Sequence, residues 1–108
     1  MGYYTSHRLE TSAKNAEEEM SVIKAFREAC EGARYAISDE GYAEEPCKWY
    51  NSSDDLIEFS KSHPEVLFTL SGEGEEAGDL WKLYVKNGKS QMARAELIYP
   101  EFDESKFT

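Results

Sequence analysis

The stretch LWKLYVKNGKSQMARAELIY, from Leu80 to Tyr99, decides the fold because it holds the clearest local signal in the chain. Its two halves, residues 80–86 and 89–99, are rich in aliphatic and aromatic residues that favour strands. Asn87-Gly88 between them is typical of a type I′ turn, which requires a positive φ at both central residues. The sequence therefore predicts a β-hairpin with a two-residue turn.

A two-residue turn also fixes which residues of the hairpin lie opposite each other. Trp81 is expected opposite Arg94, and Leu83 opposite Met92. Both faces of the hairpin are fairly apolar, so the pattern does not decide which face the helices cover. If the Trp81 face is open, Trp81 stacked by Arg94 would form a contact patch.

The chain around the hairpin alternates between strand and helix patterns. Residues 2–11 alternate in the manner of a strand, and residues 16–35 carry an apolar stripe at helical spacing. Further along we expect a short strand over residues 47–50, a helix over residues 54–62 that ends before Pro64, and a strand over residues 66–71. The resulting order is β-α-β-α-β-β-β.

This order predicts an α+β fold, a ferredoxin-like two-layer sandwich with two helices on one face of a mainly antiparallel sheet. The expected domain covers residues 1–100, and residues 101–108 form a C-terminal tail. A chain of 108 residues with 40% hydrophobic residues is long enough to bury a core. No apolar run reaches the length of a membrane span, and we expect a cytoplasmic protein.

Charge is the strongest compositional feature, and it is unevenly distributed. The net charge is −10, and residues 39–79 account for all of it, with twelve acids against two bases. The remaining residues hold ten acids and ten bases and are neutral together. Nucleic acid would be repelled by such a surface, whereas a basic protein would be attracted to it.

The glycine-rich loop SGEGEEAGD, from Ser71 to Asp79, is the densest part of this acidic region. Its acids could supply oxygen ligands to Ca²⁺ or Mg²⁺, but their spacing is not that of an EF-hand. A phosphate cradle is disfavoured, because the loop lacks a following lysine and its acids would repel phosphate. The two simpler interpretations are a solvated turn between strands and a charged recognition loop.

The residues that most often perform catalysis or bind zinc are sparse and form no motif. Cys30 and Cys47 make no CxxC pair, and His7 and His63 stand alone, so we expect two reduced thiols and neither a metal site nor a cofactor. No serine or cysteine lies in a nucleophile motif, and acids are too abundant for any pair to be informative. We therefore expect that the protein is not an enzyme.

The stretch from Lys48 to Gln91 resembles the ferredoxin-like domain of YubB-type plasmid and phage proteins. The matching features are Trp49-Tyr50, the short Asp-rich helix, Pro64 before an apolar strand, the GEGEE loop, and Leu80-Trp81 leading into the Asn87-Gly88 turn. The resemblance implies an origin in a bacteriophage or other mobile element and carries over no catalytic residue. Small acidic phage proteins include inhibitors of host defence enzymes, among them anti-CRISPR proteins.

These observations lead to one expected function and two alternatives. The expected function is a phage-encoded, non-enzymatic inhibitor, an acidic mimic of nucleic acid that binds a basic surface of a host nucleic-acid-handling protein such as a CRISPR nuclease or other defence effector. The alternatives are a self-assembling structural or regulatory phage protein and a small divalent-metal-binding domain. For the inhibitor we expect a monomer or a homodimer, with no direct binding to nucleic acid or membrane. The expected partner-binding residues are Asp54, Asp55, Glu58, Glu73, Glu75, Glu76 and Asp79, with Tyr50 and Trp81 as apolar anchors.

Overall fold

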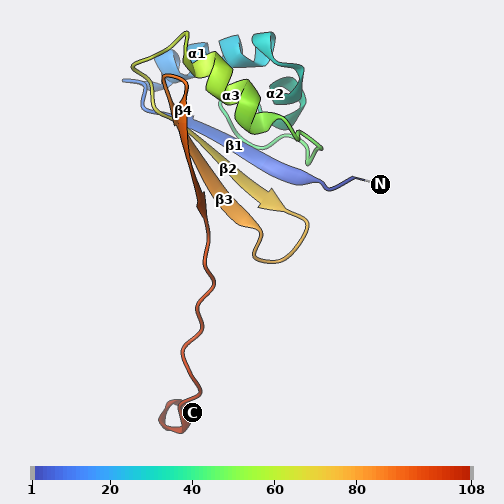
Figure 1. Ribbon diagram of the computed structural model, residues 1–108, viewed down its shortest axis with the longest axis vertical. Coiled ribbons are helices and arrows are strands. Elements are labelled where there is room, and N and C mark those ends of the chain that lie inside the picture. Colours follow the sequence, from blue (N-terminus) through green and yellow to red (C-terminus); the bar gives the residue numbers. More distant parts are fainter. Residues whose placement is uncertain (1, 108) are drawn as a thin grey trace.

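The computed structural model describes residues 2–107 and contains a four-stranded sheet packed against three helices (Figure 1). The helices lie together on one face of the sheet, and the C-terminal segment extends away from it. In chain order the elements are β1 (Thr5–Thr11), α1 (Ala16–Ala29), α2 (Glu31–Ala36), α3 (Ser52–Ser60), β2 (Phe68–Gly74), β3 (Leu80–Lys86), β4 (Lys89–Arg94) and the short 3₁₀ helix η1 (Glu104–Lys106).

The sheet is an antiparallel meander in the order β1-β2-β3-β4. The expected α+β class is confirmed, but the order of the elements differs from the prediction because all three helices lie between β1 and β2. Leu9 of β1 lies opposite Leu70 of β2, so this pairing joins segments far apart in the sequence. The hairpin register is confirmed, with Trp81 opposite Arg94 and Leu83 opposite Met92.

The strand expected over residues 47–50 is wrong. Cys47 forms one isolated bridge with Thr5, and the backbone then turns toward α3, with the amide of Ser52 donating to the carbonyl of Trp49 over 3.3 Å. Among the described residues, Cys47 is the one position of this segment that pairs with a strand. The apolar character of the segment instead reflects Trp49, whose side chain is 8% exposed and belongs to the core.

The helix expected over residues 16–35 is divided at Cys30, whose backbone is extended with φ −137°. A side chain at Gly32 would collide with the indole of Trp49, so glycine leaves room for that ring against α2. Because of this break, α1 and α2 run in different directions, and each buries apolar residues in the core. The third helix begins at Ser52, two residues before the predicted start.

The core lies between the helices and the sheet face that carries Leu70, Leu83 and Val85. Phe26 of α1 and Leu56 of α3 are fully buried against it. Because strand side chains alternate, the face that carries Trp81 and Leu83 is the covered one. This result settles the choice of face that the hairpin sequence left open.

Two strand ends differ from the expected boundaries. β2 continues to Gly74, so the acidic loop proper is short and covers residues 75–79. β4 ends at Arg94, and residues 95–103 continue as an extended segment with no regular structure. This segment explains why the radius of gyration is 16.4 Å, whereas a compact domain of this length has about 13 Å.

Candidate functional site

The acidic loop between β2 and β3 is held in place by a tyrosine from the N-terminal segment. The Tyr3 hydroxyl donates to Asp79 Oδ2 over 2.6 Å and accepts from the Glu76 amide over 3.1 Å. The hydrogen bond to Asp79 is the main cause of a raised pKa of Tyr3. The two bonds fix both the acidic side chain and the backbone of the loop.

Two further contacts fix the loop from its other sides. Glu75 Oε1 accepts from the backbone amide of Tyr4 over 3.0 Å, and Asp79 Oδ1 lies 3.5 Å from the Arg94 guanidinium. Within residues 2–107, the side chains of Glu73 and Glu76 make neither a hydrogen bond nor an ion pair, and both are exposed. The loop therefore uses the carboxylates of Glu75 and Asp79 to hold its shape, while Glu76 in the loop and Glu73 near the end of β2 are exposed to solvent.

The glycines of the loop region serve close packing. A side chain at Gly74 would collide with the Tyr3 hydroxyl and the Asp79 carboxylate, and one at Gly72 would collide with the Trp81 indole. Gly78 has φ +84°, a conformation that favours glycine. These roles account for all three glycines of the segment without a phosphate ligand.

The acids of α3 divide in the same way between internal and exposed roles. Asp55 Oδ2 accepts hydrogen bonds from Trp49 Nε1 over 2.7 Å and from Cys30 Sγ over 3.2 Å. Asp54 is exposed, and Glu58 forms an exposed ion pair with Lys61 over 2.8 Å. Asp55 thus joins α3 to the core, while Asp54 and Glu58 point to solvent.

The two expected apolar anchors lie in different surroundings. Tyr50 is 67% exposed, and its hydroxyl accepts from the Tyr3 amide over 2.9 Å, so it lies next to the residue that pins the loop. Trp81 is half-buried on the covered face of the sheet and packs edge-on against His7. Of the two, Tyr50 is the more accessible to a partner.

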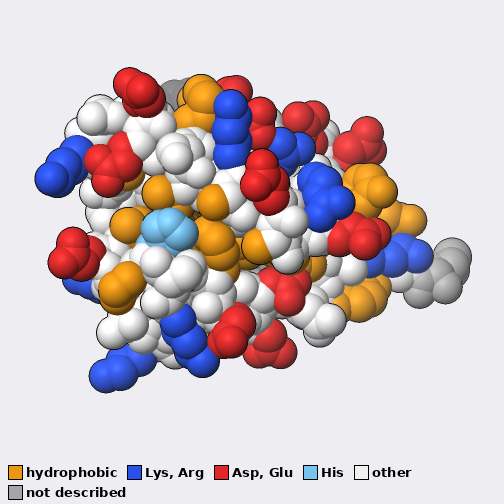
Figure 2. Space-filling model, turned by 90° about the horizontal axis from the view of Figure 1, so that it is seen from above, with side chains coloured by type: hydrophobic (Ala, Val, Ile, Leu, Met, Phe, Trp, Pro, Cys, Tyr) orange, Lys and Arg blue, Asp and Glu red, His pale blue; other side chains and the backbone are white. Residues whose placement is uncertain are grey.

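The loop acids and the α3 acids belong to different parts of the molecule. In Figure 1 the β2–β3 loop extends beyond the helical layer that contains α3. Figure 2 shows acidic side chains interspersed with lysine and arginine on the face seen from above. The structure therefore brings the loop acids together, but it joins them to the α3 acids by no described hydrogen bond or ion pair.

A buried histidine is the feature that the sequence did not identify. The His7 ring lies between Trp49 and Trp81, with ring centroids 5.2 and 6.0 Å away. Burial lowers the pKa of His7 to about 4, and its Nδ1 has no hydrogen-bond partner among the described residues. The strand alternation that aligns His7 with the buried Leu9 was the signal that could have revealed it.

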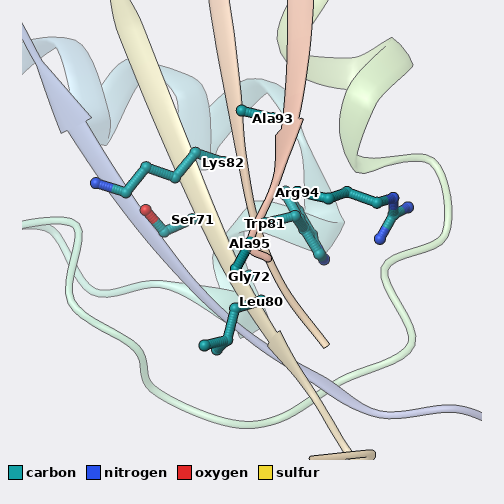
Figure 3. A pocket seen from close by; sticks show the side chains of 8 residues that line it. All are labelled: Ser71, Gly72, Leu80, Trp81, Lys82, Ala93, Arg94 and Ala95. Atoms are coloured by element: carbon teal, nitrogen blue, oxygen red, sulfur yellow. The ribbon is translucent and has the colours of Figure 1, made fainter. Parts of the chain in front are cut away.

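No cluster of three or more His, Cys, Asp or Glu side chains suited to a metal ion occurs within residues 2–107. Burial raises the pKa of both Cys30 and Cys47, so neither thiol is activated as a thiolate. A hollow of about 450 Å³ lies over β2, β3 and β4 (Figure 3). Its lining residues are Ser71, Gly72, Leu80, Trp81, Lys82, Ala93, Arg94 and Ala95.

Neither protein-family models, nor curated proteins, nor solved structures match this chain. In the described part of the chain, every helix is too short or too polar to cross a membrane.

Proposed function

We propose that the protein is a phage-encoded, non-enzymatic inhibitor that uses its acidic surface to occupy a basic, nucleic-acid-handling surface of a host defence protein. The observation that carries this proposal is the pinned acidic loop, in which Tyr3 holds Asp79 and the Glu76 backbone. Glu73 and Glu76 remain exposed on this fixed frame. The carboxylates are thus available to a partner while the backbone that bears them is held.

A fixed loop binds more tightly than a mobile one, because less conformational entropy is lost on association. The net charge of −10 would also attract a basic partner over a distance and accelerate the encounter. Tyr50, linked to the loop through Tyr3, adds an exposed aromatic ring beside the acids. Asp54 and Glu58 extend the acidic surface along α3 if the partner spans both parts.

The first experiment is a tagged pull-down from a bacterial lysate that contains CRISPR and other defence systems, eluted with a salt gradient. The proposal expects a basic nucleic-acid enzyme that elutes at moderate salt, since exposed charge pairs are screened by salt. The affinity of the purified partner is then measured for the variant Glu73→Lys, Glu75→Lys, Glu76→Lys, and we expect it to fall by well over tenfold.

A matched control reverses three exposed acids on the helices α1 and α2, Glu18→Lys, Glu28→Lys and Glu31→Lys, and changes the net charge by the same amount. This control should lose much less affinity than the loop variant. Equal losses would show that net charge alone drives binding, and an unchanged affinity of the loop variant would remove the loop from the mechanism.

A self-assembling phage protein is the second candidate, and one observation favours it. Within the part of the chain that the structure describes, β4 pairs only with β3, so its outer edge is available for another strand. Light scattering would then show a mass that rises with concentration. A Ca²⁺- or Mg²⁺-binding domain would instead show a higher melting temperature with the cation, although the described residues offer no cluster of ligands for it.

A further inference from the structure

The sheet face opposite the helices is covered by no described element and has an unexpected charge. Since Leu83 and Val85 are buried beneath the helices, Lys82, Tyr84 and Lys86 point to the other face. The register extends this open face across the sheet to Ser6, Arg8, Glu10, Thr69, Ser71, Glu73, Leu80, Lys89, Gln91 and Ala93. It carries four bases against two acids, and is therefore basic in a protein whose net charge is −10.

The hollow over β2, β3 and β4 belongs largely to this open face. Five of its lining residues occupy strand positions that face away from the helices: Ser71, Leu80, Lys82, Ala93 and Ala95. In Figure 3, Lys82 and Ser71 point to one side of the strands and Arg94 to the other. The small side chains of Ala93 and Ala95 form an apolar part of the wall of this hollow, next to Lys82.

The C-terminal arm, residues 95–107, has the complementary character. It exposes the large apolar side chains of Leu97, Ile98, Tyr99, Phe102 and Phe107, each at least 61% exposed. It also carries four acids, Glu96, Glu101, Asp103 and Glu104, against the single base Lys106. Apolar side chains of this number are normally buried against another surface.

The end of the arm is a preformed aromatic knob. The rings of Phe102 and Phe107 pack edge to face with centroids 5.2 Å apart, across the turn of η1. Asp103 Oδ1 accepts from the amide and the hydroxyl of Ser105 over 3.0 and 2.7 Å, which closes this turn. The knob is thus shaped locally, and in Figure 1 the backbone that bears it lies well away from the sheet and the helices.

We propose that the arm of one copy docks on the open sheet face of a second copy of this chain. The aromatic knob fills the hollow, and the acids of the arm lie against Lys82, Lys86 and Lys89. The extended segment 95–103 reaches about 30 Å, while a seven-residue strand is about 23 Å long, so the arm spans a neighbouring sheet. Reciprocal docking closes a two-fold symmetric dimer.

The direction of the arm favours a second copy over its own sheet. The Ala95 amide donates to the Leu80 carbonyl over 2.9 Å, and Leu97 lies against Gly78. These contacts continue the line of β4 past the end of the sheet, as Figure 1 shows. The inference does not rest on the proposed inhibitory function, although the open face shares Glu73 with the acidic region.

The test measures the mass of the full chain by light scattering across a wide concentration range. We expect the mass to rise from the 12.3 kDa of one chain to twice that value. The arm variant Phe102→Ser, Phe107→Ser and the face variant Lys82→Glu, Lys86→Glu should each raise the dimer dissociation constant at least tenfold. The control Tyr35→Ser, which changes a side chain 63% exposed on α2, should leave it unchanged.

A mixing experiment identifies the contact. The face variant Lys82→Glu, Lys86→Glu should dimerise with the arm variant Glu101→Lys, Glu104→Lys, although each alone is weakened, because the mixture restores opposite charges. A chain that stays at 12.3 kDa at every concentration would overturn the proposal. If the arm of that monomer also resists protease, the arm docks on the sheet of its own chain and not on a second copy. A dimer that neither the arm variant nor the face variant weakens would overturn it as well.

Discussion

The two faces of the sheet come from the same strands but have opposite chemistry. The covered face presents Phe68, Leu70 and Val85, all fully buried against the helices. The open face presents Arg8, Lys82 and other polar side chains from alternate positions. The comparison teaches that stability and surface chemistry can be separated residue by residue along one strand, since neighbouring side chains point in opposite directions.

The largest difference is expected between Phe68 and its neighbour Thr69. Phe68→Ala removes a fully buried ring that packs against Phe59 at a centroid distance of 5.9 Å, and should lower the free energy of unfolding by about 4 kcal/mol. Thr69→Ala changes the open face of the same strand and should cost less than about 1 kcal/mol. Urea denaturation of the wild type and both variants measures the two losses in the free energy of unfolding.

If Phe68→Ala cost as little as Thr69→Ala is expected to, the burial of Phe68 beneath the helices would contribute little to stability. If Thr69→Ala cost as much as Phe68→Ala is expected to, the face assigned as open would be covered as well. A change in the denaturant slope would instead show that Phe68→Ala alters the denatured state.

The second prediction concerns the pH dependence of the covered face through His7. The folded pKa of about 4 lies below the ordinary value of 6.5, so the unfolded chain binds a proton that the folded chain excludes as the pH falls between them. Above pH 7 the ionisation of His7 therefore leaves the free energy of unfolding unchanged. Below pH 7 it lowers the free energy of unfolding progressively, by up to about 3 kcal/mol near pH 4.

The measurement compares the stability of the wild type and His7→Phe from pH 7 to pH 4. The many carboxylates titrate in both proteins, so the difference between the curves isolates His7. We expect the wild type to lose stability relative to the variant over this range. Parallel curves would show that His7 is protonated in the folded state or exposed to water.

A smaller and local effect is expected at the edge of the covered face, where Tyr3 pins the acidic loop. Tyr3→Phe keeps the ring but removes the hydroxyl that donates to Asp79 and accepts from Glu76. Amide hydrogen exchange should become several-fold faster at Gly74, whose amide donates to the Asp79 carbonyl, and at Glu76. Exchange in β3 around Leu83 is the internal control and should not change.

The local part of the fold was predictable from the sequence, because neighbouring residues determine it. Asn87-Gly88 has positive φ at both residues, 47° and 78°, and sets the hairpin register as predicted. The pairing of β1 with β2 was not predictable, since no turn connects these strands. The close packing of Trp49 against Gly32, two residues after the break at Cys30, was not predictable either, since it is a contact between distant segments.

The candidate site was predictable in composition but not in roles. The sequence identified the loop acids, yet it could not show that Asp79 and Glu75 are engaged by Tyr3 and Tyr4. It likewise could not show that Asp55 binds the Trp49 indole. An acidic side chain has the same character in a sequence whether it is an internal acceptor or an exposed ligand, and the distinction depends on donors brought from elsewhere in the fold.

The smallest effect on folding is expected at the centre of the open face. Lys82→Ala should change the free energy of unfolding by less than about 0.5 kcal/mol, because surface substitutions away from special features rarely cost more. The adjacent Leu83→Ala, which empties a buried position, should cost several times as much. This comparison must be made at low protein concentration, where the chain is monomeric.

At high concentration the same variant gives the sharper result. A docked second copy binds only the folded state, so dimerisation raises the melting temperature of the wild type with concentration. Lys82→Ala removes a charge that faces the arm, and its melting temperature should rise less steeply. If both proteins gave the same concentration dependence, the open face would have no part in association, and Lys82 would be a solvated side chain on a face that serves only to complete the sheet.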